Sequence, residues 1–302
     1  MSDKPMPLAE HAELRLLPPI RSEFERFQVE ASMPGTIERE LSPWERIRDN
    51  TAIRRVFILG VLIAVWEVYA RWLGNPLMFP TFSDTIATFW DALVNGPLLD
   101  RIATSLRVLL IGYAAGIVLA GFFTALAVST QAGQDLLSTL TAMFNPLPAI
   151  ALLPLSLLWF GLGVPSLVFV IIHSVLWAVC LNTLTGFLSV ADAQRMAGRN
   201  LGLRGLRFVF SILIPAASAS IIAGLKIGWA FAWRTLIAAE LVFGVSSRSG
   251  GLGWYIFENR NQLETAAVFA GLLAVILIGL IVESVVFRTL ENHTVRKWGM
   301  QR

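Results

Sequence analysis

The chain has 302 residues, of which 55% are hydrophobic and only 15% are charged, and its net charge is +3. Because a soluble domain carries about a quarter charged residues, this composition excludes an ordinary soluble protein. It indicates an all-α protein that crosses a membrane several times. The small net charge does not suggest nucleic-acid binding. A single cysteine and three widely separated histidines exclude a disulfide framework and predict no metal site.

Residues 1–50 differ in composition from the rest of the chain. They are polar and include Pro18-Pro19 and Pro34-Gly35, and they lack the apolar core of a secretory signal. We expect a cytoplasmic N-terminal tail that is disordered or loosely attached. A transmembrane domain is predicted to follow over residues 51–302.

Six apolar stretches are each long enough to cross a bilayer. The third contains Asn145 and three prolines, which remove backbone donors, so we expect this helix to be bent or broken. An amphipathic stretch precedes the second span, and Ser83 is its predicted N-cap. The predicted spans cover residues 53–73, 108–128, 136–160, 164–188, 216–243 and 266–287.

Basic residues are distributed unevenly between the two sides of the membrane. With the N-terminus inside, 12 of them flank the spans on the cytoplasmic side and 5 on the other. The positive-inside rule therefore predicts that both termini and residues 191–215 are cytoplasmic. Residues 74–107, a short turn near Gly163 and residues 245–264 are predicted to be exterior.

Small residues recur at intervals of four in the second and fifth spans. Such stripes let two helix backbones approach closely in a membrane, and both static packing and a moving interface fit the pattern. The stripes are Gly112, Gly116, Ala120 and Thr124, and Ser220, Gly224, Gly228 and Ala232.

Polar residues inside the spans are candidates for a translocation pathway, because they are costly in lipid and usually face a cavity or the bundle interior. In the fifth span Lys226, Trp233 and Glu240 are spaced by seven and share a face, whereas Arg234 lies about 100° around the helix. A structural role, with both cations reaching toward the surfaces, is an equal alternative. The candidate pathway residues are Asn145, His173, Trp229, Trp233, Arg234 and Glu240.

A structural role is favoured for Glu67 and Glu283, and for His173 among the candidates. Glu67 and Glu283 lie near the ends of their spans, where a carboxylate reaches headgroups or water. His173 is isolated in the fourth span, where a satisfied polar residue is favoured over a proton relay.

Residues 191–215 form a basic, glycine-rich segment between two apolar spans. The sequence predicts helices over Ala191–Leu201 and Leu203–Phe210 about a bend at Gly202, with Pro215 in the first turn of span five. This segment has too little apolar surface to fold alone. A groove in another protein or contact with anionic lipid would accommodate it equally well. The chain contains no phosphate-binding loop of the type that hydrolyses ATP and no catalytic constellation.

The spacing from Gly202 to Pro215, with Ile212 and Ile214 before the proline, resembles the coupling loop of ABC importer permeases. In that family Glu-Ala-Ala, three residues, Gly and nine residues precede Ile-x-Leu-Pro. The stretches NPLPAIALLPLSLLWFGLG (145–163), AGLKIGWAFAWRTLIAAELVFG (223–244) and SGGLGWYIFENRNQLETAAVFAGLL (249–273) are similar to the nitrate, sulfonate and taurine importer branch. The resemblance covers about residues 53–300.

The coupling loop departs from the family pattern at its start. Aligned on Gly202, Met196 stands in place of the glutamate, Ala197 and Gly198 stand at the two alanines, and Ile214 replaces the leucine. Arg195 and Arg199 are expected to be available for a different partner contact. The residues that the resemblance assigns to coupling are Arg195, Met196, Ala197, Gly198, Arg199, Gly202, Leu203, Arg204, Arg207 and Pro215.

The resemblance implies a type I importer permease with six transmembrane helices in the bacterial cytoplasmic membrane. It implies a homodimer, two ATPase subunits that bind ATP and Mg, and an extracytoplasmic solute-binding protein. This chain would bind no cofactor and catalyse no reaction. The implied substrate is a small anion or organic anion of the nitrate, sulfonate, taurine, bicarbonate or aromatic carboxylate class. A secondary transporter driven by an ion gradient is the alternative, and a membrane enzyme or scaffold is disfavoured.

Overall fold

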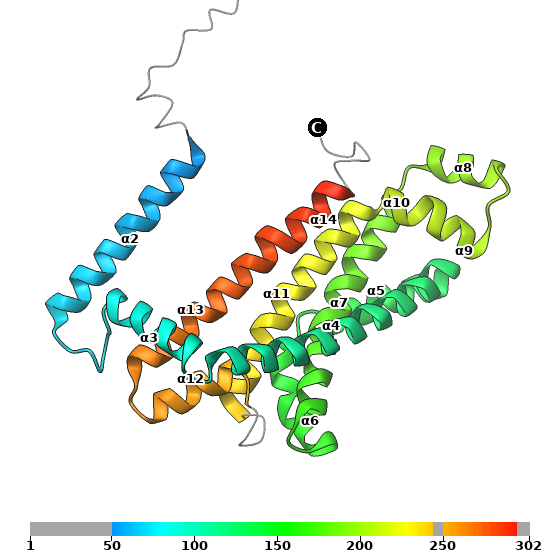
Figure 1. Ribbon diagram of the computed structural model, residues 1–302. Coiled ribbons are helices and arrows are strands. Elements are labelled where there is room, and N and C mark those ends of the chain that lie inside the picture. The colour runs from blue at the N-terminus through cyan, green and yellow to red at the C-terminus, as the bar shows by residue number, and fades with distance from the viewer. Residues whose placement is uncertain (1–49, 244–249, 295–302) are drawn as a thin grey trace, which may run out of the picture. The chain divides into compact units, whose positions relative to one another are not determined.

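The computed structural model describes residues 50–243 and 250–294, and within these ranges the secondary structure is entirely helical. Five helices are long and apolar enough to cross a membrane, or six if one bent pair counts as a single span (Figure 1). This confirms the predicted all-α membrane architecture. Residues 1–49 of the predicted tail lie outside the described residues.

Between residues 51 and 188 the chain alternates long apolar helices with shorter ones. In chain order these are α2 (Thr51–Leu73), α3 (Phe82–Val94), α4 (Leu98–Ser129), α5 (Gln131–Phe144), a 3-10 turn η1 (Ala149–Leu152), α6 (Leu153–Phe160) and α7 (Val164–Leu188).

The second part of the chain begins with short helices and continues with two long ones. Two segments, η2 and η3, have π-helical hydrogen bonding. The elements are α8 (Asp192–Asn200), α9 (Gly205–Phe208), η2 (Val209–Leu213), α10 (Ile214–Ala216), α11 (Ser218–Phe243), α12 (Leu252–Asn261), α13 (Thr265–Ile281), η3 (Val282–Phe287) and α14 (Arg288–His293). In Figure 1, α8 and α14 lie at one end of the bundle, and α3 and α12 lie at the other.

Helix boundaries follow the predictions where local chemistry sets them. Helix α7 has the predicted bounds, because Gly163 has a φ of +151° and Pro165 suits the first helical turn. Helix α4 begins ten residues before the predicted span, directly after Pro97. The prediction missed this because it assigned the charged residues Asp100 and Arg101 to an exterior loop.

The third predicted span is broken, as its prolines require. Helix α5 ends at Phe144, and the pair formed by α5 with η1 and α6 is bent by 87°. Pro146 and Pro148 lie in this break and cannot donate backbone hydrogen bonds. The amide of Asn145 still donates to Thr141 O at 2.9 Å, so the last turn of α5 is complete before the chain turns.

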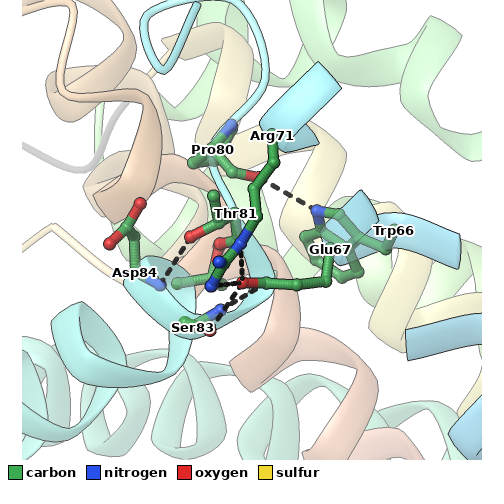
Figure 2. Close-up of polar contacts among 8 residues, drawn as sticks. Trp66, Glu67, Arg71, Pro80, Thr81, Ser83 and Asp84 are labelled. Atoms are coloured by element: carbon green, nitrogen blue, oxygen red, sulfur yellow. Dashed lines mark hydrogen bonds and ion pairs between the residues drawn. The ribbon is translucent and has the colours of Figure 1, made fainter. Parts of the chain in front are cut away.

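The start of α3 is bound to α2 by one carboxylate (Figure 2). Glu67 accepts hydrogen bonds from the amide of Ser83 (3.1 Å) and from its hydroxyl (2.9 Å), and it pairs with Arg71. The helix N-cap is therefore Thr81, whose hydroxyl accepts from the amide of Asp84 at 3.0 Å. The prediction of Ser83 as N-cap was wrong, because that side chain is used for Glu67.

Helix α7 lies at the centre of the bundle and is the most buried of the candidate spans. The stripe on α4 packs on one side of it: a Cβ built at Gly116 would lie 2.7 Å from Val175 Cβ. The stripe on α11 packs on another: a Cβ at Gly224 would lie 2.8 Å from Asn182 Cβ. Both stripes therefore serve as close-packing surfaces against the same helix.

This packing predicts a sharp difference between two glycines of α4. We expect Gly116→Leu to lower the free energy of unfolding by roughly 1–3 kcal/mol or more, because the new side chain would overlap Val175. Thermal unfolding of the purified chain in detergent measures this.

Gly121→Leu is the matched control, since nothing lies within 4 Å of a Cβ at that exposed position. Equal stability of the two variants would contradict the close packing of α4 on α7.

Candidate functional site

Two regions contain most of the residues singled out in the sequence. One is the segment from α8 to α10, which corresponds to the predicted coupling loop. The other is a cavity beside the break between α5 and η1. They lie at different levels of α7.

The bend at Gly202 closes helix α8 with a Schellman motif. Gly202 has a left-handed φ of +75°, its amide donates to Arg199 O (2.9 Å), and the amide of Leu203 donates to Gly198 O (3.1 Å). These bonds satisfy carbonyls that the end of a helix leaves free. Glycine is required here because an L side chain is strained in this conformation. The predicted bend is thus a specific helix terminator.

The inner face of α8 is fastened to the rest of the chain. Arg195 donates from Nε to Val190 O at 3.1 Å and from Nη2 to Phe187 O, so it caps the last turn of α7. Gly198 is buried, and a Cβ there would lie 2.9 Å from the ring of Phe208. Arg195 is half-buried and uses two of its N–H groups to bind the end of α7, and its contact with a partner stays a prediction.

A second hydrophobic cluster lies beneath this segment, separate from the main core. It is formed by Phe187 and Val190 at the end of α7 together with Leu213 and Ala217, all buried. Pro215 lies in the first turn of α10, and a turn at Ala217 separates α10 from α11. Span five therefore begins at Ser218, and Pro215 starts a short helix that precedes it.

The outer face of the segment is exposed. Met196 and Leu201 are 58% and 77% exposed, which is high for apolar side chains at a helix end. Leu203 is half-buried. The other residues of the predicted coupling set that are exposed are Ala197, Arg199, Gly202, Arg204 and Arg207. The exposed side of this segment thus carries both apolar side chains and arginines, while its inner side is bound to the rest of the chain.

The cavity beside the helix break has a volume of about 350 Å³. Helices α5, α7 and α11 and the turn η1 contribute to it. It brings together three of the predicted pathway residues, Asn145, His173 and Arg234, which come from three different spans. Its polar and aromatic lining consists mainly of Phe144, Asn145, His173, Trp177, Phe231 and Arg234.

Several polar atoms of the residues that line this cavity have no hydrogen-bond partner among the described residues. Both ring nitrogens of His173 and the indole nitrogen of Trp177 are buried without a hydrogen bond. Arg234 donates to Ala230 O on its own helix and lies 5.2 Å from the centre of the Phe231 ring. No carboxylate within the described ranges lies within ion-pair distance of Arg234.

The other predicted pathway residues lie elsewhere. Trp233 is buried and donates to Val275 O of α13 at 3.3 Å. Trp229 packs edge-on against Tyr113, 5.3 Å between ring centres, and its indole nitrogen is buried without a partner in the described part of the chain. Lys226 pairs with Glu283 at 3.1 Å. The face that Lys226 shares with Trp233 therefore packs against the bundle and does not line the cavity.

Glu240 is fully buried and joins three helices. Its carboxylate accepts from the Ser105 hydroxyl of α4 at 2.8–2.9 Å and from the amide of Gly253 in α12 at 2.8 Å. The Ser105 hydroxyl in turn accepts from the amide of Leu252 at 2.7 Å. Sequence reasoning missed Ser105 because it lies 135 residues from its partner. The first turn of α12 is thus held by a buried side-chain pair.

Within residues 50–243 and 250–294, no group of three or more His, Cys, Asp or Glu side chains lies close enough to hold a metal ion. Cys180 is buried in α7 and its thiol contacts Ala120 O at 3.7 Å.

Residues 113–288 match the sequence profile of a family described as the inner membrane component of binding-protein-dependent transport systems. The match covers more than half of the chain. The chain belongs to this family. It is therefore an ABC importer permease, and the predicted resemblance is confirmed.

Individual relatives give the same result. A nitrate import permease protein of Synechocystis is 28% identical over 255 residues, which cover 81% of this chain and 90% of its own length. A taurine transport system permease protein of Escherichia coli is 29% identical over 233 residues, 74% and 82% of the two chains. A Methanocaldococcus jannaschii protein that is provisionally named an ABC transporter permease is 29% identical over 251 residues, 79% and 90% of the two chains. The permease thus resembles the nitrate, sulfonate and taurine branch over most of its length.

The buried carboxylate of the permease leads to a stability prediction. We expect Glu240→Leu to lower the free energy of unfolding by about 2–4 kcal/mol, because it leaves the buried Gly253 amide and the Ser105 hydroxyl without their acceptor. Thermal unfolding of the purified chain in detergent measures the effect.

Glu258→Leu is the control. It removes a partly exposed carboxylate that lies 3.5 Å from Arg101. The free energy of unfolding should therefore fall by less than about 1 kcal/mol. If both variants unfold at the same temperature, Glu240 does not hold α12 in place.

Proposed function

We propose that this permease forms the translocation pathway of an ATP-driven importer for a small anion or organic anion. The candidate substrates are nitrate, sulfonates, taurine, bicarbonate and aromatic carboxylates. The names of two relatives, which refer to nitrate and taurine, support an anion-transporting branch. The cavity that contains Arg234, His173 and Asn145 is the proposed pathway site. Trp229, Trp233 and Glu240 lie outside it and contact neighbouring helices of the bundle.

The anchored α8 segment is the observation that carries the coupling proposal. Its inner face is bound through Arg195 and Gly198, whereas Met196 and Leu201 point outward without cover. A partner that binds the outer face of α8 would move the end of α7 together with α8. We infer that the partner is an ATPase subunit and that two of these subunits bind a permease homodimer.

The surrounding assembly follows from this role. The ATPase subunits bind ATP and Mg and carry out hydrolysis, while this chain binds no cofactor and is not an enzyme. A solute-binding protein delivers the substrate at the opposite end of the bundle. The membrane is the bacterial cytoplasmic membrane, and both termini and the tail of residues 1–50 are cytoplasmic. Membrane lipid surrounds residues 51–302, and nucleic acid has no part in the function.

Reconstitution tests the proposal directly. The chain would be purified with its cognate ATPase and binding protein, placed in proteoliposomes and supplied with labelled anions. We expect uptake that requires ATP and Mg and that stops when the ATPase is omitted. Uptake by the isolated chain under a proton or sodium gradient, without nucleotide, would instead establish the secondary-transporter alternative.

Charge reversal on the outer face tests the coupling segment. We expect the double variant Arg199→Glu, Arg204→Glu to abolish copurification with the ATPase and to reduce ATP-driven uptake at least about tenfold, since each reversed contact costs more than the roughly 1.4 kcal/mol that a factor of ten represents. Both side chains are exposed, so folding should be unaffected.

Arg288→Glu is the matched control, because this exposed arginine belongs to α14 at the same end of the bundle. If Arg288→Glu weakens the complex as much as the double variant does, general attraction to anionic lipid explains the arginines better than a docked ATPase.

A further inference from the structure

The cavity beside the α5–η1 break has an uneven chemistry. Its described lining includes a guanidinium, an imidazole and an indole N–H, but neither Asp nor Glu. Arginine and tryptophan are donors only, and a neutral imidazole has one donor and one acceptor. The lining therefore presents an excess of donors, which suits a ligand that carries acceptors and negative charge.

Buried polar atoms without hydrogen bonds destabilise the folded protein. An unpaired buried polar group costs about 1–3 kcal/mol, and three such atoms lie on two side chains here, His173 Nδ1 and Nε2 and Trp177 Nε1. The residues are four apart on α7, so they project from the same helical face. Both side chains line the cavity, but their nitrogens are shielded from a water-sized probe, so a rotation of either ring is needed to bring a nitrogen to a group bound there.

Much of the rest of the wall is aromatic, and its two hydroxyl groups, on Ser174 and Thr235, are hydrogen-bonded to each other. The Phe144 and Trp177 rings are stacked, with centres 5.2 Å apart and planes at 15°. Phe231 lies under the Arg234 guanidinium on the opposite helix. Aromatic walls of this kind stabilise planar apolar groups through offset or edge-on contacts. A bare inorganic anion would use the donors and leave these rings without contact.

The volume favours an organic ligand. A cavity of about 350 Å³ lies at the lower end of the roughly 300–1,000 Å³ range of small-molecule sites, and those sites bury most of the ligand surface. A water molecule occupies about 30 Å³, so a nitrate ion would leave most of the space to solvent. A single aromatic ring with one acidic group matches the space better.

We propose that this cavity is a binding site for an organic anion with a planar apolar body, an aromatic carboxylate or sulfonate. The inference rests on the proposed function, because it specifies the substrate class of the same pathway. Arg234, which is exposed to the cavity, binds the acidic group, and the His173 ring adds a donor once it turns toward the ligand. Phe144 and Trp177 receive the ring, and Asn145 at the end of α5 contributes a polar contact at the rim.

Direct binding to the purified full-length permease in lipid nanodiscs tests the proposal. Equilibrium dialysis would use three labelled probes: benzenesulfonate, nitrate and the neutral aromatic benzamide. We expect benzenesulfonate to bind at least about tenfold more tightly than either of the others, because it alone engages both the donors and the rings. Equal or tighter binding of nitrate, or no binding of benzenesulfonate, would overturn the proposal.

Substitutions at Arg234 locate the site. Arg234→Gln should weaken benzenesulfonate binding roughly 10- to 100-fold, as expected for the loss of a hydrogen bond to a charged group, and should leave benzamide binding unchanged. Arg234→Lys retains the charge and should preserve most of the affinity. Because the two variants differ in charge but not in cavity position, a loss in both with an unchanged unfolding temperature would contradict a charge-based site.

Arg260→Gln is the matched control. Arg260 also lies over an aromatic ring, Phe257, at 5.3 Å, but outside the cavity, and its loss should leave all three affinities unchanged. Trp177→Phe, which keeps a ring and removes the N–H, should weaken binding only several-fold. If Arg260→Gln matches Arg234→Gln, the anion binds elsewhere and the proposal fails.

The binding assay contains neither ATPase nor solute-binding protein. Loss of ATP-driven uptake with intact benzenesulfonate binding would therefore count against the proposed importer function alone. Normal ATP-driven uptake of nitrate together with no selective benzenesulfonate binding would count against the substrate class alone.

Discussion

The close approach of α4 and α11 to α7 is the constraint on which the bundle depends. Lipid removes the hydrophobic incentive for helices to associate, so dispersion contacts between closely spaced backbones have to supply it. Gly112 and Gly116 of α4 and Gly224 and Gly228 of α11 allow this approach. Larger side chains at these positions would separate both neighbours from α7.

Helix α7 consequently connects the two regions of functional interest. His173 and Trp177 line the cavity from the middle of α7. At the end of α7, the carbonyl oxygen of Phe187 accepts a hydrogen bond from the Arg195 guanidinium. Ten residues of helix separate Trp177 from Phe187, a distance of about 15 Å at 1.5 Å per residue. Under the proposed function, a displacement of α8 would reach the cavity through this one packed helix.

The two faces of α8 explain the departure from the family pattern at its start. The inner face is occupied by Arg195 and Gly198, which hold α8 against α7 and η2. Met196, which stands where the family pattern has a glutamate, is on the outer face and is 58% exposed.

Much of the fold follows from local sequence signals, because proline, glycine and apolar length act within a few residues. The bounds of α7, the break after Phe144 and the bend at Gly202 are of this kind. The stripes also predicted close helix packing, although only the structure identified α7 as their common partner.

Long-range pairs were not predictable from the sequence, because they depend on which segments meet in space. Examples are Glu240 with Ser105, Glu67 with Ser83, and Trp233 with α13. The candidate site was found in part, since Asn145, His173 and Arg234 converge but their aromatic neighbours gave no sequence signal.

The most direct test of the central claim measures access to the cavity in two nucleotide states. Ala238 lines the cavity, and the native Cys180 is fully buried, so wild type provides an unreactive background for an Ala238→Cys variant. Alkylation by a membrane-impermeant thiol reagent would be followed in the assembled complex from each side of the membrane. We expect reaction from the ATPase side without nucleotide, and from the opposite side when ATP is bound but not hydrolysed. The same rate from the same side in both states would contradict a cavity that is coupled through α7 to the ATPase.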